Sequence, residues 1–246
     1  MASTQNAELL AASPLFAGLN RNTLKEMAGA LTLESWPKDF HLQAPDSPTG
    51  RFLILVRGRV KITRSNSQTG RELTLWLLGP GDGFDVVTLL DAEPHSVSAW
   101  TLDEVQVLSG PVSLFREWIE RFPAFRLAIH RYVARQLREL TDLASDLALH
   151  DTMTRLARLL LRHFDTPGRG NAARLDLIRD LPQEELATLI GSVRVVVSRL
   201  LAELKREAIV ELHNGALRVA DLKRLLHRAE AQIQRTVGKV RRGVRR

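Results

Sequence analysis

The sequence predicts an α+β chain that begins with a β jelly-roll domain, continues into a long helix and ends in a winged helix-turn-helix domain. Three observations support this prediction. Short apolar runs separated by Gly, Pro and Asp fill residues 15–109, as is typical of a barrel or jelly roll. A long helical pattern follows over residues 123–149. Two helical segments around a glycine corner, and then an Asn-Gly hairpin, occupy residues 181–219.

The first domain, residues 1–118, is predicted from its strand-sized segments. Their turns fall at Arg57-Gly58, Thr69-Gly70 and Gly79-Pro-Gly-Asp82, residue types that favour tight turns. A short helix from Arg21 to Leu31, with Asn20 as its cap, precedes the strands. The predicted strands are Phe52–Val56, Val60–Thr63, Glu72–Leu78, Ser96–Trp100 and Val105–Leu108.

The long helix, assigned to residues 119–150, carries an apolar seam. Its apolar side chains recur at alternating intervals of four and three residues, the spacing of the a and d positions of a coiled coil. Such a stripe packs either on its own domain or on a second copy of the chain, and the spacing alone does not choose between them. A two-fold reader of DNA needs a dimer axis, so the helix-turn-helix favours a homodimer. The predicted interface residues are Val133, Leu137, Leu140, Ala144 and Leu147.

The junction between the long helix and the last domain is predicted at Asp151. This residue stands at the start of a helical segment that reaches Phe164, where a carboxylate can accept a hydrogen bond from the first turn. We therefore expect Asp151 to mark the hinge and the winged domain to occupy residues 151–228.

The winged helix-turn-helix is predicted from two helices and a hairpin. Gly191 supplies the tight corner between a helix from Gln183 to Ile190 and a second helix. Segments Ile209–Leu212 and Ala216–Val219 alternate at period two around His213-Asn214-Gly215, which predicts the wing. The buried stripe of the second helix is expected to comprise Val197, Leu200, Leu201 and Leu204.

The opposite face of the second helix is the predicted recognition surface. Arg194 and Arg199 are expected to point outward, where each can donate paired hydrogen bonds to O6 and N7 of a guanine in the major groove. A helix pair of this kind also occurs in purely structural three-helix modules. The rest of the sequence must therefore show whether this pair binds DNA. The predicted DNA-binding residues are Ser192, Val193, Arg194, Val195, Ser198 and Arg199.

Charge supplies that context, because it is segregated along the chain. Residues 151–246 carry 20 Lys and Arg against 11 Asp and Glu, whereas residues 1–150 carry 15 against 17. A cationic domain gains free energy on a polyanion through counterion release, so the segregation favours double-stranded DNA as the partner. Part of the excess lies in a basic tail at residues 229–246, whose self-repulsion predicts a disordered arm.

Composition excludes several classes of protein. The 246 residues contain no cysteine, which rules out disulfides, thiolate-held iron–sulfur clusters and cysteine-based zinc sites. The sequence has no His-x-His pair of a cupin-type metal site, no nucleophile elbow and no phosphate-binding Gly-Lys loop. We therefore assign no catalytic residue and no metal ligand. The sequence shows no leader and no membrane-spanning run, so we expect a cytoplasmic protein with no membrane partner.

The order of these parts resembles the family of bacterial transcription regulators that includes the cyclic-AMP receptor protein and the fumarate and nitrate reduction regulator. The resemblance covers about residues 12–225. It implies a cyclic-nucleotide-binding-like sensor domain, a homodimer, a palindromic operator and a contact with RNA polymerase, which we expect at the loop from Thr166 to Ala173. The matching segments are Ser13–Leu19, Leu55–Ile62, Leu78–Asp82, Leu147–Asp151, Gln183–Gly191 and Val197–Leu201.

The recognition helix of this family usually reads Ser-Arg-Glu-Thr-Val-Ser-Arg, and the corresponding run here is residues 193–199. Both arginines match, which implies that Arg194 and Arg199 are the groove-facing donors. Val195 replaces the family's glutamate, which accepts from cytosine N4. A valine contacts only apolar groups such as a thymine methyl, so the operator is expected to differ from that of the cyclic-AMP receptor protein.

The effector pocket departs further from the family pattern. Members that bind cyclic AMP use a Gly-Glu-Leu turn and an Arg-Ser-Ala strand, and the aligned segments here are Asp85-Val86-Val87 and Val97-Ser98-Ala99. The Arg and the Glu are missing, and the Asp85 carboxylate would repel a phosphate, so we expect an effector other than cyclic AMP. The pocket residues that the resemblance implies are Asp85, Val86, Val87, Thr88, Val97, Ser98, Leu140 and Thr141.

Other interpretations remain open. A haem-dependent gas sensor of the same family would need an axial ligand, for which His95 or His130 is the first candidate. Alternatively, the chain has no ligand, or an apolar ligand occupies a barrel lined by Val86, Val87, Leu89 and Trp100. A protein of another class, an architectural DNA-binding protein, would bind through charge with a steep salt dependence and little sequence preference.

Overall fold

The structure is a computed structural model that describes residues 2–43, 50–93, 95–163, 177–213 and 216–230. It contains two compact units. Unit 1 comprises residues 1–70 and 75–140, and unit 2 comprises residues 71–74 and 141–246. The loop predicted to contact RNA polymerase, the tip of the wing and residues 231–246 of the basic tail lie outside the described residues.

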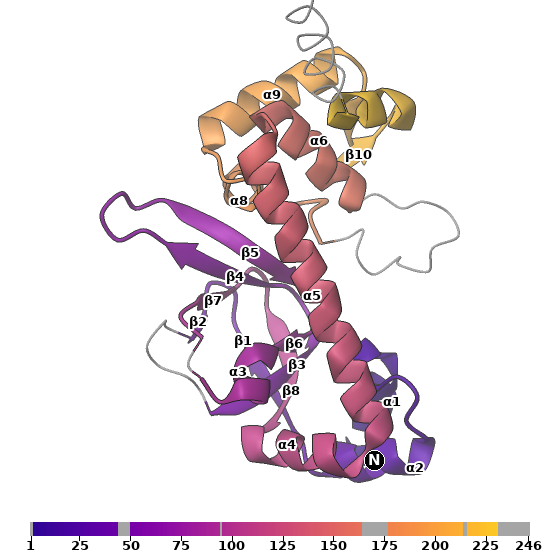
Figure 1. The fold of residues 1–246 in the computed structure, drawn as a ribbon. Coiled ribbons are helices and arrows are strands. Elements are labelled where there is room, and N and C mark those ends of the chain that lie inside the picture. The colour runs from indigo at the N-terminus through magenta and orange to yellow at the C-terminus, as the bar shows by residue number, and fades with distance from the viewer. Residues whose placement is uncertain (1, 44–49, 94, 164–176, 214–215, 231–246) are drawn as a thin grey trace, which may run out of the picture. The chain divides into compact units, whose positions relative to one another are not determined.

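Unit 1 is built on two antiparallel sheets, with strand orders β1–β8–β3–β6 and β2–β7–β4–β5 (Figure 1). In the first sheet Ile54 pairs with Leu108, and in the second Ile62 pairs with Ala99. This arrangement confirms the predicted jelly-roll domain. The strands are β1 (Thr32–Trp36), β2 (His41–Gln43), β3 (Arg51–Arg57), β4 (Val60–Ser65), β5 (Glu72–Leu78), β6 (Gly83–Phe84), β7 (Ser98–Thr101) and β8 (Val105–Pro111).

Strand β3 is buried on both faces, which explains why its sequence is a continuous apolar run. Successive side chains of a strand point to opposite faces of the sheet. Phe52 and Ile54 therefore join a core with the helices of unit 1, whereas Leu53 and Leu55 join the core between the two sheets. The helix-side core holds the aromatic pairs Phe52–Phe115 and Phe16–Phe125, with ring centroids 4.8 and 5.1 Å apart.

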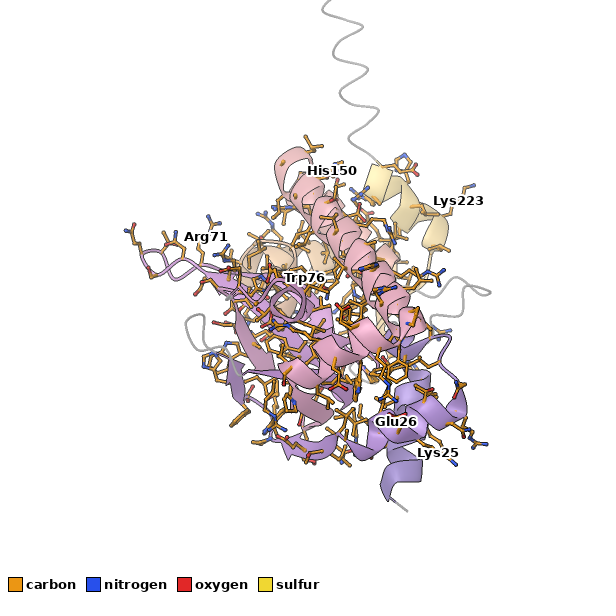
Figure 2. All side chains as sticks on the ribbon, turned by 60° about the horizontal axis from the view of Figure 1, so that its bottom comes forward. Lys25, Glu26, Arg71, Trp76, His150 and Lys223 are labelled. Carbon is orange, nitrogen blue, oxygen red and sulfur yellow. The ribbon has the colours of Figure 1, made fainter. Side chains whose placement is uncertain are left out.

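The helices of unit 1 cover the outer face of the first sheet. In α2, the Asn20 side chain accepts a hydrogen bond from the Thr23 backbone N–H at 3.0 Å, as predicted for its cap. Lys25 and Glu26 of α2 are exposed (Figure 2), while Met27 is fully buried. The short helices are α1 (Ala2–Ala12), a 3₁₀ turn at Pro14–Phe16, α2 (Arg21–Gly29), α3 (Val86–Asp91) and α4 (Val112–Arg121).

The long helix α5 spans Pro123–Leu149, matching the helical pattern in the sequence. Its expected start at residue 119 is too early, because residues 119–121 close the separate helix α4. Phe122 is extended, with φ −118° and ψ 98°. A residue before proline avoids the helical conformation because the proline ring clashes with it, and Pro123 therefore divides the two helices.

Unit 2 contains the predicted winged helix-turn-helix. Its elements are α6 (Thr152–Arg162), α8 (Gln183–Leu189), α9 (Arg194–Arg206), β9 (Val210–His213), β10 (Ala216–Val219) and a helical segment at 222–230. The core of the unit includes Leu156 and Leu160 of α6, Leu186 of α8, and the predicted α9 stripe of Val197, Leu200, Leu201 and Leu204. The stripe is buried because it repeats at helical spacing on one face.

Candidate functional sites

The corner between α8 and α9 depends on one glycine. Gly191 has φ +60°, a conformation that glycine adopts without strain, and the Ser192 N–H donates to the Ala187 carbonyl at 2.8 Å. A Cβ atom at residue 191 would lie 2.5 Å from Leu147 Cδ2. The predicted corner is therefore confirmed, and it also fits closely against the last turns of α5.

The N-terminal half of helix α9 has a solvent-exposed outer face. Arg194, Val195, Ser198 and Arg199 are exposed, and Val195 keeps 79% of its surface accessible, the highest value among the large apolar side chains described. Val193 is exposed as the residue before the helix, and Ser192 is half-buried. The structure thus places the six predicted DNA-binding residues together, from the corner into the second turn of α9.

The two arginines on this face differ from several other described arginines of unit 2, whose side chains form ion pairs. Within the described part of the chain, the side chains of Arg194 and Arg199 make no hydrogen bond and no ion pair. In contrast, Arg228 forms an ion pair with Glu207, an interaction that lowers the pKa of the Glu207 carboxyl and raises the pKa of Arg228. The guanidinium groups on α9 are therefore available to an outside acceptor.

The wing follows α9 directly. Strands β9 and β10 pair antiparallel, with Leu217 opposite Leu212 and Val219 opposite Val210. Ala208 turns the chain out of α9 with φ +54°, and the Ile209 N–H donates back to the Leu204 carbonyl at 2.9 Å. The hairpin is thus fastened to the C-terminal end of α9.

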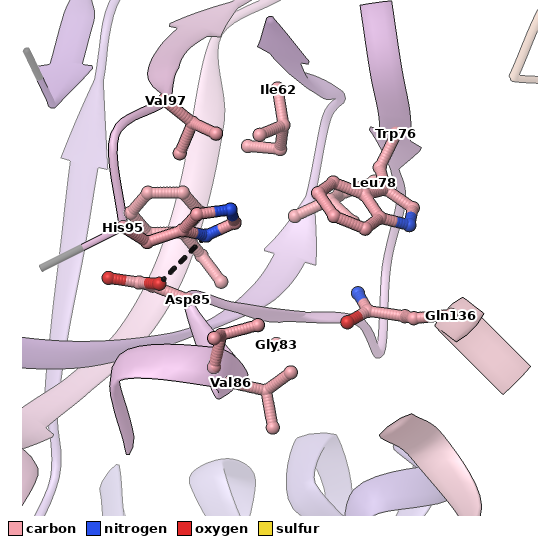
Figure 3. Close-up of a pocket in the computed structure, with 11 residues that line it drawn as sticks. Ile62, Trp76, Leu78, Gly83, Asp85, Val86, His95, Val97 and Gln136 are labelled. Atoms are coloured by element: carbon pink, nitrogen blue, oxygen red, sulfur yellow. Dashed lines mark ion pairs between the residues drawn. The ribbon is translucent and has the colours of Figure 1, made fainter. Parts of the chain in front are cut away.

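Unit 1 holds a pocket between the sheets and α5 (Figure 3). Its cavity measures about 20 Å³, room for roughly one water-sized group. Its polar lining comes from Asp85, His95, Trp76 and Gln136, the last projecting from α5. The remaining lining residues are Ile62, Leu78, Gly83, Phe84, Val86, Val87 and Val97.

Asp85 dominates the electrostatics of this pocket. It has the left-handed φ of +64° and precedes the first turn of α3. Its side chain is only 8% exposed, and His95 Nδ1 lies 3.5 Å from its Oδ1 (dashed in Figure 3). That oxygen is buried and makes no hydrogen bond with any described residue, and the same holds for the indole Nε1 of Trp76.

Helix α5 is fastened to the floor of the pocket by hydrogen bonds. The Tyr132 hydroxyl donates to the Gly83 carbonyl and accepts from the Gly83 N–H, both at 3.1 Å. Gln136 Nε2 donates to the same hydroxyl at 3.2 Å, and Arg135 forms an ion pair with Asp82 at 2.9 Å. Burial, reinforced by the nearby Asp82 charge, raises the pKa of Tyr132 well above its usual range. The pocket and α5 therefore share one polar network.

Several residues that the sequence suggested for the pocket lie elsewhere. Asp85, Val86, Val87 and Val97 line it, as the resemblance implied. Thr88, in contrast, donates to the Glu93 carbonyl, and Ser98 pairs with Thr63 in the second sheet. Leu140 and Thr141 are not among its lining residues, because Gln136, one helical turn earlier, is the α5 residue that reaches it.

The apolar barrel lining suggested by Leu89 and Trp100 is also not formed. Leu89 is fully buried in the helix-side core, and Trp100 stacks on His41 with ring centroids 4.0 Å apart. Of the two histidines considered for haem, His95 lines the pocket and His130 is exposed on α5. Within the described residues, no three His, Asp or Glu side chains gather as a metal site.

The seam residues of α5 fall into two groups. Val133 packs on the core of unit 1, and Leu147 packs near Gly191 within unit 2. Leu137 is 64% exposed, Ala144 is exposed and Leu140 is half-buried. The middle of the seam is therefore the part whose apolar surface the subunit itself leaves accessible.

The expected hinge residue caps α6. The Asp151 side chain accepts from the Thr154 N–H at 2.8 Å, which confirms it as the N-cap. The sequence analysis missed Asp146, whose side chain is 2% exposed and forms ion pairs with Arg158 at 2.5 Å and Arg162 at 2.8 Å. The two arginines are one helical turn apart on α6. No local sequence pattern, however, indicates that they pair with Asp146 of α5.

No helix among the described residues is long and apolar enough to cross a bilayer.

Two protein families match the chain. Residues 33–122 match the family described as cyclic nucleotide-binding domain, and residues 154–228 match the family described as Crp-like helix-turn-helix domain. The matched ranges coincide with the jelly roll of unit 1 and the winged domain of unit 2.

Curated relatives extend over most of the chain. The CRP-like cAMP-activated global transcriptional regulator of Mycobacterium tuberculosis is 31% identical over 222 residues, which are 90% of this chain and 99% of that protein. The cyclic AMP receptor protein of Thermus thermophilus is 31% identical over 85% of this chain and 93% of its own length. In fold, the c-di-GMP-responsive regulator CLP of Xanthomonas campestris has a TM-score of 0.68 at 19% identity, covering 82% of this chain and 100% of that one.

Proposed function

Because the chain belongs to the CRP/FNR family of transcription regulators, we propose that it binds a palindromic operator sequence-specifically as a homodimer, and that an effector in unit 1 sets its affinity for DNA. The observation that carries the proposal is the exposed pair Arg194 and Arg199, whose guanidinium groups make no hydrogen bond or ion pair within the described chain. Exposed, unpaired arginines on the second helix of such a motif are suited to base readout.

In this proposal the face of α9 binds DNA through three kinds of contact, two to bases and one to phosphates. Arg194 and Arg199 donate to guanine O6 and N7, and each such pair discriminates by about 1–3 kcal/mol. Val195 places an apolar group in the groove and packs on a thymine methyl. Ser198 and Ser192 can donate to phosphate oxygens, which fix the position of the helix without specifying sequence.

The homodimer would form along the middle of α5, where Leu137 and Ala144 are exposed and Leu140 is half-buried. Two-fold symmetry would place two α9 helices about 34 Å apart, one turn of B-DNA. We expect sedimentation of the full-length protein to give twice the chain mass of 27.6 kDa. Leu137→Glu should produce monomers with weakened operator affinity, because a buried, unpaired carboxylate is costly at an interface.

The effector is proposed to differ from cyclic AMP, although two relatives are named for it. A phosphate in a buried pocket needs a cationic partner. No Lys or Arg is among the described residues that line this pocket, and Asp85 adds negative charge. For the haem alternative, which would use His95, an absorption spectrum of the purified protein is decisive, since bound haem absorbs strongly in the visible region.

We do not assign catalysis to this chain, and we place it in the cytoplasm as a regulator with RNA polymerase as a further partner. The loop expected to contact the polymerase, Thr166 to Ala173, lies outside the described residues. The proposed partners of the chain are thus duplex DNA, a second copy and the polymerase.

The test is selection of binding sites from a random DNA library, followed by affinity measurements at fixed salt. A regulator should select a palindrome and prefer it over random duplex by about a thousandfold or more. An architectural DNA-binding protein would instead show a steep salt dependence and nearly equal affinity for both duplexes. Equal affinity would refute the proposed function.

A further inference from the structure

The Asp85 carboxylate is an acidic group of the pocket that is not fully satisfied. It is more than nine-tenths buried, and its Oδ1 makes no hydrogen bond with a described residue. His95 Nδ1 approaches to 3.5 Å, which is beyond the distance typical of a charge-assisted bond. A carboxylate buried without a close partner is costly, so the pocket favours an occupant that donates to it.

A second unsatisfied atom lines the same pocket. The indole Nε1 of Trp76 is buried and has no acceptor among the described residues. The Trp76 and His95 rings lie edge to face, with centroids 6.0 Å apart, and the Asp85 carboxylate is on the other side of His95 (Figure 3). A ligand beside Asp85 therefore meets one acidic acceptor, while the Trp76 indole N–H is an unsatisfied donor on the opposite part of the pocket lining.

We propose that this pocket binds a small organic cation, whose protonated nitrogen donates to Asp85. The inference rests on the proposed function, because it takes the pocket as the effector site. A cavity of about 20 Å³ matches an ammonium-sized head group. A longer ligand must displace the side chain of Trp76 or Gln136.

The polar network behind the pocket gives the ligand a route to α5. Gln136 both lines the pocket and donates to the Tyr132 hydroxyl, which in turn holds the backbone of Gly83. A cation at Asp85 that also reaches the Gln136 side chain would change the hydrogen bond from Gln136 to Tyr132 on α5. Such a differential contact is what an effector needs to shift a conformational equilibrium.

The test uses the full-length protein without DNA, labelled with ¹⁵N at its four tryptophan indoles. Methylammonium and guanidinium chlorides are titrated at constant ionic strength, with sodium acetate and cyclic AMP as anionic counterparts. Trp76→Phe identifies the Trp76 indole signal. We expect a saturable shift of this signal with both cations and none with either anion.

Two variants test the carboxylate. Asp85→Asn keeps the shape and tolerates the left-handed backbone, and Asp85→Gly removes the side chain where glycine is unstrained. Both should weaken cation binding about tenfold or more, the worth of a hydrogen bond to a charged group. The matched control is Asp91→Asn, an exposed acid at the other end of α3, which should leave binding unchanged.

Two results would overturn the inference: saturation by acetate or cyclic AMP, or cation binding as tight in Asp85→Asn as in the unaltered protein. Absence of any cation shift would also overturn it, because His95 would then already satisfy Asp85. Operator affinity of the same samples separates the two proposals. Specific DNA binding without cation binding contradicts only this inference, and cation binding without sequence preference contradicts only the regulator.

Discussion

The outer face of α9 and the pocket of unit 1 both keep a charged group without a close hydrogen-bond partner, but in opposite surroundings. Arg194 and Arg199 are exposed to water, which solvates them until an acceptor arrives. Asp85 is buried and has no such solvation. An unpaired charge is inexpensive at a surface and costly in an interior. We therefore expect the arginines of α9 to stay exposed in the free protein at little cost in stability. The pocket, in contrast, should stabilise the folded protein when a cation occupies it.

Among tests of DNA binding by the outer face of α9, Arg194→Ala is expected to have the largest effect. Loss of one bidentate contact should remove about 1–3 kcal/mol of discrimination at one G·C pair, while affinity for random duplex falls little. Fluorescence anisotropy on a selected operator and a random duplex measures both. Arg121→Ala, which removes an exposed arginine from unit 1, is the matched control. Equal loss on the two duplexes would mean that Arg194 contacts only phosphates.

The next effect concerns the network behind the pocket. Tyr132→Phe should destabilise unit 1 by about 1–3 kcal/mol, because the buried Gly83 N–H and carbonyl lose their partner. Urea unfolding followed by tryptophan fluorescence measures this, since all four tryptophans lie in unit 1. Unchanged stability would show that water replaces the hydroxyl, and the proposed link from pocket to α5 would then be lost.

A smaller effect is expected at Val195. Replacing the contacted thymine by uracil removes one methyl group, which should weaken operator binding about fourfold at a burial value near 0.8 kcal/mol per carbon. Val195→Ala should reduce this difference between thymine and uracil, because the smaller side chain makes less contact with the methyl group. Leu226→Ala, another exposed apolar residue of unit 2, should retain it. A full-strength response to uracil in Val195→Ala would assign the methyl contact to a different residue.

The smallest effect is expected when a surface ion pair is removed. This change serves as a reference for the cost of losing a charge contact outside both sites. Arg59 donates two hydrogen bonds to Asp103, at 2.7 and 2.8 Å, and this pairing lowers the pKa of the Asp103 carboxyl. The stabilisation is therefore present above the unfolded value near 3.8 and is lost as pH falls through the lower folded value. Asp103→Asn should cost about 1 kcal/mol or less at neutral pH, and the cost should shrink in acid. Thermal unfolding at pH 7 and pH 3 checks this, and an equal cost at both values would contradict it.

The sequence was sufficient for features that depend on local periodicity. The α9 face follows from the spacing of its apolar stripe, and the bounds of α5 agree with its helical pattern. The N-caps Asn20 and Asp151 follow from side chains that accept hydrogen bonds from the next turn. In each case the interacting groups are within a few residues of one another, so the sequence alone displays the geometry.

Features that join distant segments were not predictable in this way. Trp76, His95 and Gln136 come from three separate elements, and only the folded domain brings them to one pocket. The short edge strand β1 was missed because its exposed and half-buried residues lack a clear apolar alternation. The pairing of Asp146 with two arginines of α6 likewise depends on the angle at which α5 and α6 meet.

The left-handed backbone at residue 85 bears on how pockets of this kind diverge among related regulators. Asp, Asn and Gly all tolerate this conformation, and these residues differ in charge and in the space that they occupy. One substitution can therefore exchange an acidic chamber for a neutral or roomier one without disturbing the surrounding strands. At this position, new chemical selectivity can arise at little cost to folding.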